Sequence, residues 1–103
     1  MLTINIYYRG KDAINFMNEM ESSGIADAIR SKDGCLRYDY FIPVKEENTV
    51  LLIDSWSNQE ALDEHHHSDL MPKIASLRDK YDVHMTVERY VEEINNDEKY
   101  IRE

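Results

Sequence analysis

The fold is decided by one stretch of the sequence, residues 50–71, which reads VLLIDSWSNQEALDEHHHSDLM. It begins with a continuous apolar run, Val50 to Ile53, and runs of this kind form strands that are covered on both faces. Ser57 is then expected to cap a short helix, with Glu60 three residues later completing a capping box. The stretch therefore predicts a buried strand that leads directly into a capped helix.

Two side chains of this stretch carry potential chemistry. Trp56 stands at the end of the strand, and His65 lies on the helix one turn after Ala61. Residues four apart on a helix share a face, so His65 is expected on the same inward side as Ala61. An aromatic ring and an imidazole would then border one pocket. The alternative is structural, because a core tryptophan and a helix-end histidine give the same pattern.

Composition limits the class of protein. The 103 residues are 42% hydrophobic and 32% charged, which is typical of one soluble globular domain. The net charge is −9, and no cluster of Lys and Arg stands out. Nucleic acids and anionic membranes require concentrated positive charge, so neither is expected as the main partner.

The cellular setting is predicted from what the sequence lacks. Cys35 is the single cysteine, so an intrachain disulfide cannot form and a reducing compartment is expected. The first residues do not have the basic and apolar segments of a signal peptide, and no run of about 18 apolar residues occurs. These features predict a cytoplasmic protein.

The remaining elements follow from periodicity and turn residues. A period-2 pattern predicts the first strand, and a long helix capped by Asp12 follows, weakened where Gly24 interrupts it. A helix is expected to restart at Ser68 with Pro72 in its first turn. The predicted strands are residues 2–8, 35–42, 50–56 and 83–91, and the predicted long helix is 12–30.

The resulting order, β-α-β-β-α-α-β, is the ferredoxin-like pattern of the α+β class. It predicts a four-stranded antiparallel sheet with helices on one face, formed by residues 1–91. Residues 92–103 are expected to be an acidic C-terminal tail or a dimer arm. In the strand that starts at Val50, the residues on both faces are apolar, so the second face also needs a cover. The simplest cover is a second copy of the sheet, which predicts a homodimer.

Four further residues are candidates for a site. Asn5 points off the apolar face of the first strand, and its amide could place an oxyanion or an oxygen intermediate. Tyr38 and Tyr40 share a face and are expected either to line an aromatic substrate or to pack across strands. Arg89 is expected either to pair with Asp54 or to bind an anionic substrate. Sequence does not choose between these alternatives.

The three successive histidines, His65, His66 and His67, do not predict a metal site. Successive helical residues point about 100° apart and cannot close on one ion. An imidazole titrates near neutrality, so His65 is expected either to accept a phenolic proton or to hydrogen-bond a carbonyl oxygen. The structural alternative is a helix-end histidine favoured by the helix dipole.

Several motifs together resemble the antibiotic biosynthesis monooxygenase family, whose members are dimeric α/β-barrel proteins and include small quinol monooxygenases. The motifs are Gly34-Cys-Leu-Arg-Tyr38, Leu52-Ile-Asp-Ser-Trp56, Glu60-Ala-Leu-Asp-Glu-His65, and residues 81–89 before Tyr90. The resemblance covers residues 2–91. It implies two sheets that close a barrel and a separate pocket in each subunit between sheet and helices. It also implies no metal, flavin or haem cofactor, because the deprotonated phenol or hydroquinone itself reacts with oxygen.

The sequence departs from the family pattern at two places. Many members carry a second histidine at the position of Leu70, and haem-degrading relatives carry a tryptophan at that of His65 and a histidine at that of Ala75. The expected function is a cofactor-independent monooxygenase that acts on a small aromatic or quinol-type substrate with molecular oxygen. The alternatives are a small-molecule isomerase on the same scaffold and a non-catalytic dimeric binding module. The expected catalytic residues are His65 and Asn5, and the expected substrate-binding residues are Trp56, Tyr38, Tyr40 and Arg89.

Overall fold

The computed structural model describes residues 1–91, and the tail predicted for residues 92–103 lies outside the described residues. Four strands and four helices follow one another along the described chain. Their bounds are β1 Leu2–Arg9, α1 Ala13–Ser22, α2 Ile25–Arg30, β2 Cys35–Phe41, β3 Thr49–Trp56, α3 Gln59–His66, α4 Leu70–Tyr81 and β4 His84–Val91.

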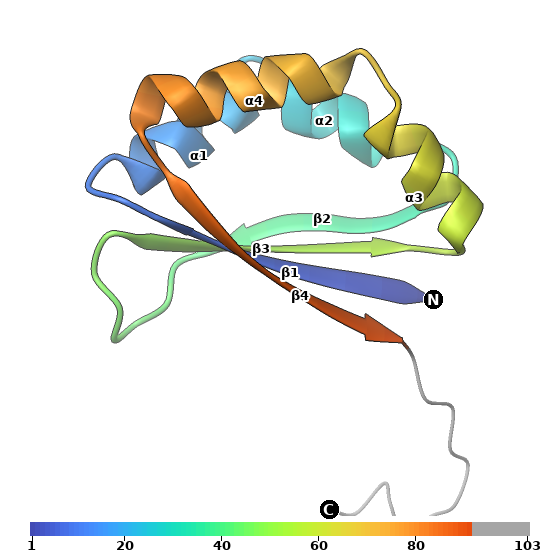
Figure 1. Ribbon diagram of the computed structural model, residues 1–103, viewed down its shortest axis with the longest axis horizontal. Coiled ribbons are helices and arrows are strands. Elements are labelled where there is room, and N and C mark those ends of the chain that lie inside the picture. The colour runs from blue at the N-terminus through green and yellow to red at the C-terminus, as the bar shows by residue number, and fades with distance from the viewer. Residues whose placement is uncertain (92–103) are drawn as a thin grey trace, which may run out of the picture.

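The strands form one antiparallel sheet in the order β2-β3-β1-β4, and all four helices cover the same face of it (Figure 1). This arrangement confirms the predicted α+β, ferredoxin-like class. The predicted first helix is divided in two, because Gly24 adopts φ +85° between α1 and α2. Only glycine takes up this left-handed conformation without strain, so the break occurs at the position where the sequence weakens the helix.

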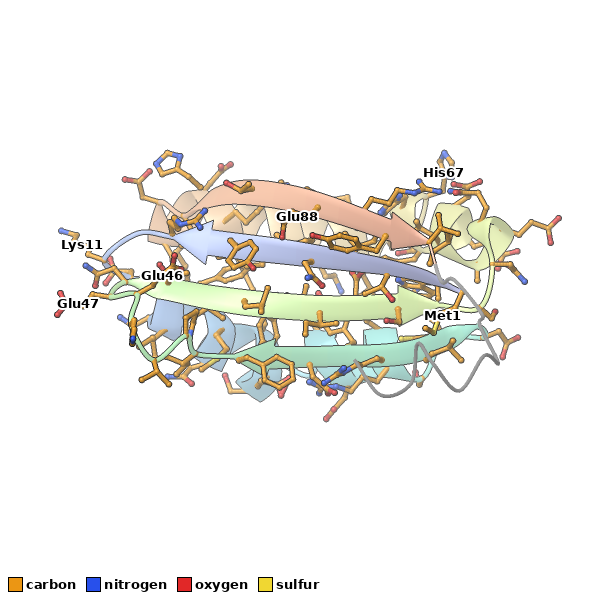
Figure 2. The ribbon with its side chains drawn as sticks, turned by 90° about the horizontal axis from the view of Figure 1, so that it is seen from below. Met1, Lys11, Glu46, Glu47, His67 and Glu88 are labelled. Atoms are coloured by element: carbon orange, nitrogen blue, oxygen red, sulfur yellow. The ribbon has the colours of Figure 1, made fainter. Side chains whose placement is uncertain are left out.

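The alternation of side chains along β1 separates the two faces of the sheet. Leu2, Ile4 and Tyr8 are buried under the helices, and Asn5 between them points to the open face. Figure 2 looks onto this open face, from which Glu88 projects beside β1. Whether a strand residue has an even or odd position therefore decides if its side chain faces the helices or the open side of the sheet.

The core lies between the sheet and the helices, and the buried strand β3 contributes Val50, Leu52 and Trp56 to it. Alternate residues of β3 point toward the helices, while Leu51 and Ile53 are half-buried on the open face. Within residues 1–91 the helices thus cover one face of β3. The second copy of the sheet, which the sequence predicted as the cover of the other face, stays a prediction. The largest fully buried side chains are Trp56, Phe16, Met20, Ile29, Leu52, Leu62 and Val50.

The start of α3 corrects one sequence prediction. The N-cap is Asn58, not Ser57: the Asn58 side chain accepts a hydrogen bond of 2.9 Å from the backbone N–H of Ala61. The reason is a contact distant in sequence, because the N–H of Ser57 donates to the carbonyl of Gly34 at 2.8 Å and so ties Ser57 to the residue before β2. The helix begins one residue later than the capping-box pattern indicates.

None of the helices within residues 1–91 is both long and apolar enough to cross a membrane.

Gly34 precedes β2 and packs closely against Ala61 of α3. Comparison with Gly24, which has no such neighbour, tests how much this close packing matters for stability. A Cβ at Gly34 would lie 2.5 Å from the Cβ of Ala61, whereas a Cβ at Gly24 meets nothing within 4 Å. Both glycines have positive φ, at +81° and +85°. Gly24→Ala is expected to lower the free energy of unfolding by about 1 kcal/mol through backbone strain alone. Gly34→Ala should cost a further ~1–3 kcal/mol because α3 must move.

Urea unfolding of the two variants measures this difference. Equal destabilisation would mean that α3 accommodates the methyl group freely and that the contact does not fix the helix.

Candidate functional site

A cavity of about 320 Å³ lies on the helix-covered face of the sheet, with α3 and α4 above it and β4 along one side. Ligand sites in proteins have volumes of this order and are mostly apolar with a few polar groups. Its apolar lining includes Ile4, Ile6, Leu52, Leu62, Met71 and Ile74. The few ionisable groups among the lining residues therefore decide what chemistry the cavity supports.

Asp54 is the acidic group of the cavity. It belongs to β3, points toward the helices, and its Oδ1 atom is buried without a hydrogen-bond partner. Burial raises the pKa of this carboxyl from 3.8 to about 7, and the nearby Trp56 indole partly opposes the rise. A carboxyl that titrates at neutral pH inside an apolar cavity can accept or donate a proton under physiological conditions.

His65 of α3 is stacked on Trp56, the last residue of β3. Their ring centroids lie 4.9 Å apart and the ring planes are 18° from parallel. His65 lines the cavity, whereas Trp56 is fully buried behind it. Burial is the main cause that lowers the pKa of His65 to about 4, and the charges of His66 and Lys32 add to it. The imidazole is therefore neutral at pH 7, where it can exchange hydrogen bonds but is a weak base.

Arg89 lies on the same row of the sheet as Asp54, with Ile4 of β1 between them. Its guanidinium donates a hydrogen bond to the Gln59 side chain at the start of α3. Among the described residues, no carboxylate lies within 4.0 Å of Arg89, so the pairing with Asp54 that the sequence left open is not formed. This side chain is exposed at the rim of the cavity.

Of the two tyrosines of β2, Tyr38 lines the cavity and Tyr40 lies next to it but outside the cavity. Tyr38 lines the cavity, next to Asp54 in the register of β2 and β3. Tyr40 contacts Tyr38 edge to face, with ring centroids 5.9 Å apart, but borders a different hollow near Arg30. Burial raises the pKa of both phenols well above the usual range, so both stay protonated. Tyr38 is placed to contact a ligand, and Tyr40 supports it from behind.

Asn5 does not belong to this cavity. The cavity-lining residues Ile4 and Ile6 flank it on β1, so its side chain points through the opposite face of the sheet. Its neighbours there are Ile53 and Glu88, and its Oδ1 atom is buried without a hydrogen-bond partner. The structure thus brings together His65, Trp56, Tyr38 and Arg89, and it separates Asn5 from them by the thickness of the sheet.

The histidine run does not gather around one point. His65 and His66 both border the cavity, with ring centroids 5.7 Å apart, while the ring of His67 lies against the Asp63 carbonyl. Within residues 1–91, no group of three or more His, Cys, Asp or Glu side chains is placed to hold a metal ion.

Two cavity residues were not identified as site residues from the sequence, Asp54 as a proton-transfer group and Arg78 of α4. A signal for the first exists: Leu52, Asp54 and Trp56 share one parity, and a carboxylate between two core residues of a buried strand is unusual. Arg78 has no comparable signal, because an arginine late in a helix is ordinary.

The fold and cavity define a class of small ferredoxin-like proteins with a ligand-sized pocket between sheet and helices. The family model for antibiotic biosynthesis monooxygenases matches residues 21–76, which is more than half of the chain. The chain therefore belongs to the antibiotic biosynthesis monooxygenase family. No functionally curated protein matches it at the sequence level.

Solved structures share the fold at low sequence identity. A protein of Deinococcus radiodurans, provisionally named as an antibiotic biosynthesis monooxygenase, is 20% identical, with a TM-score of 0.76 over 92% of this chain and 97% of the other. SnoaB of Streptomyces nogalater, a cofactor-independent oxygenase, is 10% identical, with a TM-score of 0.73 over 94% and 96%. A Bacteroides thetaiotaomicron protein of unknown function, described as a possible oxidoreductase, is 18% identical, with a TM-score of 0.72 over 86% and 94%. At these identities the likeness concerns the fold alone.

The buried carboxyl makes a testable contribution to stability. Between pH 3.8 and about 7, Asp54 is neutral in the folded protein and ionised in the unfolded chain, so its contribution to stability is lost as the pH rises through this window. Asp54→Asn removes this effect. The variant should match the wild type near pH 4 and exceed its free energy of unfolding by on the order of 2–4 kcal/mol at pH 8.

Urea unfolding at a series of pH values measures this difference, with the exposed Asp63→Asn of α3 as control. A difference that does not change with pH would show that Asp54 titrates normally.

Proposed function

We propose that the chain is a cofactor-independent monooxygenase that acts on a small aromatic or quinol-type substrate with molecular oxygen, in the cavity between the sheet and helices α3 and α4. The observation that carries the proposal is the buried Asp54 carboxyl, whose Oδ1 atom has no hydrogen-bond partner, inside an apolar cavity. Phenols react with oxygen far more readily as phenolates, so a base in a cavity that accepts aromatic rings is the principal requirement. Membership of the family supports the same reaction class.

Asp54 is a better proton acceptor than His65 at neutral pH. General bases work best when their pKa lies near the working pH, and Asp54 meets this condition with a pKa of about 7. His65, with a pKa of about 4, remains neutral and holds the substrate hydroxyl by a hydrogen bond. Tyr38 forms a wall for the ring, and Arg89 at the rim stabilises negative charge that develops on oxygen. Asn5 lies on the other face and has no part in this site.

The reaction balances without an added cofactor. Asp54 takes the phenolic proton, and the phenolate ring carbon gives electrons to oxygen and forms a carbon–oxygen bond. The peroxide takes up a proton, its O–O bond breaks, and loss of the proton on the same ring carbon leaves a new carbonyl group. One oxygen atom ends in the product and the other leaves as water, and the substrate supplies all four electrons. The apolar walls keep bulk water from the intermediate.

An isomerase is the second candidate, and one observation favours it. A carboxyl that titrates near pH 7 and a neutral imidazole border the same cavity, which suffices to move a proton between two carbon atoms of a carbonyl compound without oxygen. An oxygen electrode with a panel of hydroquinones and hydroxynaphthalenes separates the candidates. Stoichiometric oxygen uptake supports the monooxygenase, and substrate deuterium exchange without uptake supports the isomerase.

Binding of ligands with neither reaction would leave a non-catalytic binding module.

If Asp54 is the base, the pH dependence of kcat/KM and the relative loss of kcat/KM in two variants can be predicted. The value of kcat/KM should rise tenfold per pH unit and level off above about 7, because Asp54 must be ionised to accept the proton. Asp54→Asn should lower kcat/KM by about 10²–10⁴ and remove this inflection. His65→Gln should lower it by only about tenfold, the worth of one hydrogen bond.

His67→Gln is the matched control, since His67 lies outside the cavity on the same helical run. An inflection near pH 4 with a larger loss in His65→Gln would assign the base to His65 instead.

We also propose that a second copy of the chain covers the open face of the sheet, as the family resemblance implies. Leu51 and Ile53 of β3 lie half-buried on this face, and Phe41 of the neighbouring strand is 39% exposed. The Asn5 amide oxygen also lacks a partner there. Apolar side chains and an unsatisfied buried acceptor favour a protein partner over water.

Sedimentation equilibrium at micromolar concentration should therefore give twice the chain mass of 12.2 kDa. Ile53→Asp, which places a charge on the open face, should shift the protein toward the single chain. Val44→Asp is the control, because Val44 is 99% exposed in the loop between β2 and β3. A wild-type protein that sediments as a single chain would remove the dimer from the proposal.

A further inference from the structure

Arg78 is a basic residue of the cavity that lacks an acidic partner among residues 1–91. It is half-buried on α4, and its Nη1 atom lies 2.8 Å from the sulfur of Met85. A thioether is a weak acceptor, so most of the five N–H donors of the guanidinium have no protein partner of comparable strength. No carboxylate of residues 1–91 lies within 4.0 Å of it.

Four other cations of the described chain are paired with carboxylates. Arg9 lies near Glu46, Arg30 contacts Glu21 and Asp27, Arg37 contacts Asp39, and Lys80 contacts Glu19. Carboxylates are thus abundant on this surface, and the cavity wall at Arg78 is free of them. A guanidinium kept next to an apolar cavity without an acid is available for an anion from outside the chain.

The register places Arg78 and Asp54 at opposite ends of the cavity. Met85, which contacts Arg78, pairs with Tyr8 on β1, whereas Asp54 pairs with Ile4. Positions 4 and 8 of one strand are separated by about 13 Å. Arg78 therefore lies at the Tyr8 end of the cavity through its contact with Met85. Between the two ends lies an apolar floor.

That floor is formed by Ile6 and its two cross-strand neighbours, Leu52 and Val87. The cavity thus has a carboxyl at one end, an apolar middle and a guanidinium at the other end, so a ligand with two different ends would bind in one orientation. It fits a flat molecule with a hydroxyl group at one end and a negative charge at the other.

We propose that Arg78 binds the acidic substituent of an elongated hydroxyaryl carboxylate, whose reacting hydroxyl group lies at Asp54. The proposal rests on the proposed function for the identity of the reacting end, and it adds the polarity and the approximate length of the substrate. The second cation, Arg89, does not take this role, because it lies on the Asp54 row and is held by Gln59. A carboxylate there would stand beside the ionised carboxyl of Asp54.

Binding of matched probes under nitrogen tests this inference without any turnover. The probes are 6-hydroxy-2-naphthoate, with its carboxylate far from the hydroxyl group, its neutral methyl ester, and 3-hydroxy-2-naphthoate, in which the two groups are adjacent. Isothermal titration calorimetry gives Kd for each. A charge-assisted contact predicts that the 6-hydroxy acid binds roughly 10- to 100-fold more tightly than its ester. The 3-hydroxy acid should bind no more tightly than that ester, because its carboxylate cannot reach Arg78 while its hydroxyl group lies at Asp54.

Variants locate the charge that causes the gain. Arg78→Gln should abolish the preference for the acid and leave the Kd of the ester unchanged, and Arg78→Lys should keep part of the preference because it keeps the charge. Lys73→Gln removes a positive charge from an exposed position of the same helix and should change nothing. Urea unfolding of Arg78→Gln checks that the helix is intact.

The outcomes separate this inference from the proposed function. Equal binding of acid and ester, or a preference that survives Arg78→Gln, overturns the inference, while oxygen uptake with neutral hydroquinones still supports the monooxygenase. Loss of the preference in Arg89→Gln in place of Arg78→Gln also overturns it, because the anion then lies at the Asp54 end. If no probe binds, this inference falls, and oxygen uptake with neutral hydroquinones decides the proposed function separately.

Discussion

The burial of one carboxyl, that of Asp54, is the constraint on which the rest of the site depends. β3 is the second strand of the sheet and is covered by helices along its length, so an inward residue there is removed from water. An ionised carboxylate in such a place costs several kcal/mol unless it is paired, and Asp54 has no ion-pair partner among the described residues. The result is a pKa near 7 and a group that changes charge at physiological pH. Packing does not require this residue, because an apolar side chain of the same size would be more stable there.

The same desolvation has opposite effects on the two titratable groups of the cavity. It raises the pKa of the acid, Asp54, and lowers the pKa of the base, His65, because in each case it penalises the charged form. The pKa of Asp54 therefore lies above that of His65, which is the reverse of their order in water. At pH 6 both groups are mostly neutral. A cavity of this kind accepts an apolar ring at low desolvation cost and develops charge only when a proton moves. The stacking of Trp56 on His65 fixes the imidazole and keeps this arrangement rigid.

The sequence was sufficient for the order of the elements, the antiparallel sheet and the break near Gly24, because these depend on local periodicity and on the conformational freedom of glycine. It misplaced the start of α3 by one residue, since the Ser57–Gly34 hydrogen bond joins segments far apart in the chain. Strand parity placed Asn5 off the apolar face of the first strand, as observed, but the sequence did not show that the cavity lies on the opposite side of the sheet. The pKa of His65 could not be predicted, because its burial depends on how α3 packs on the sheet.

The role of Arg78 illustrates why membership of a family and a shared fold do not define a substrate. The backbone arrangement is common to proteins that are 10–20% identical to this chain, so it cannot carry information about any one ligand. That information lies in which ends of the cavity are charged, and here the charge comes from a carboxyl on β3 and a guanidinium on α4. Because the two groups lie on different elements, their separation is set by the sheet register and by the packing of α4. A relative with the same fold but an apolar residue at the position of Arg78 would keep the reaction end of this cavity and lose its selectivity for an anion.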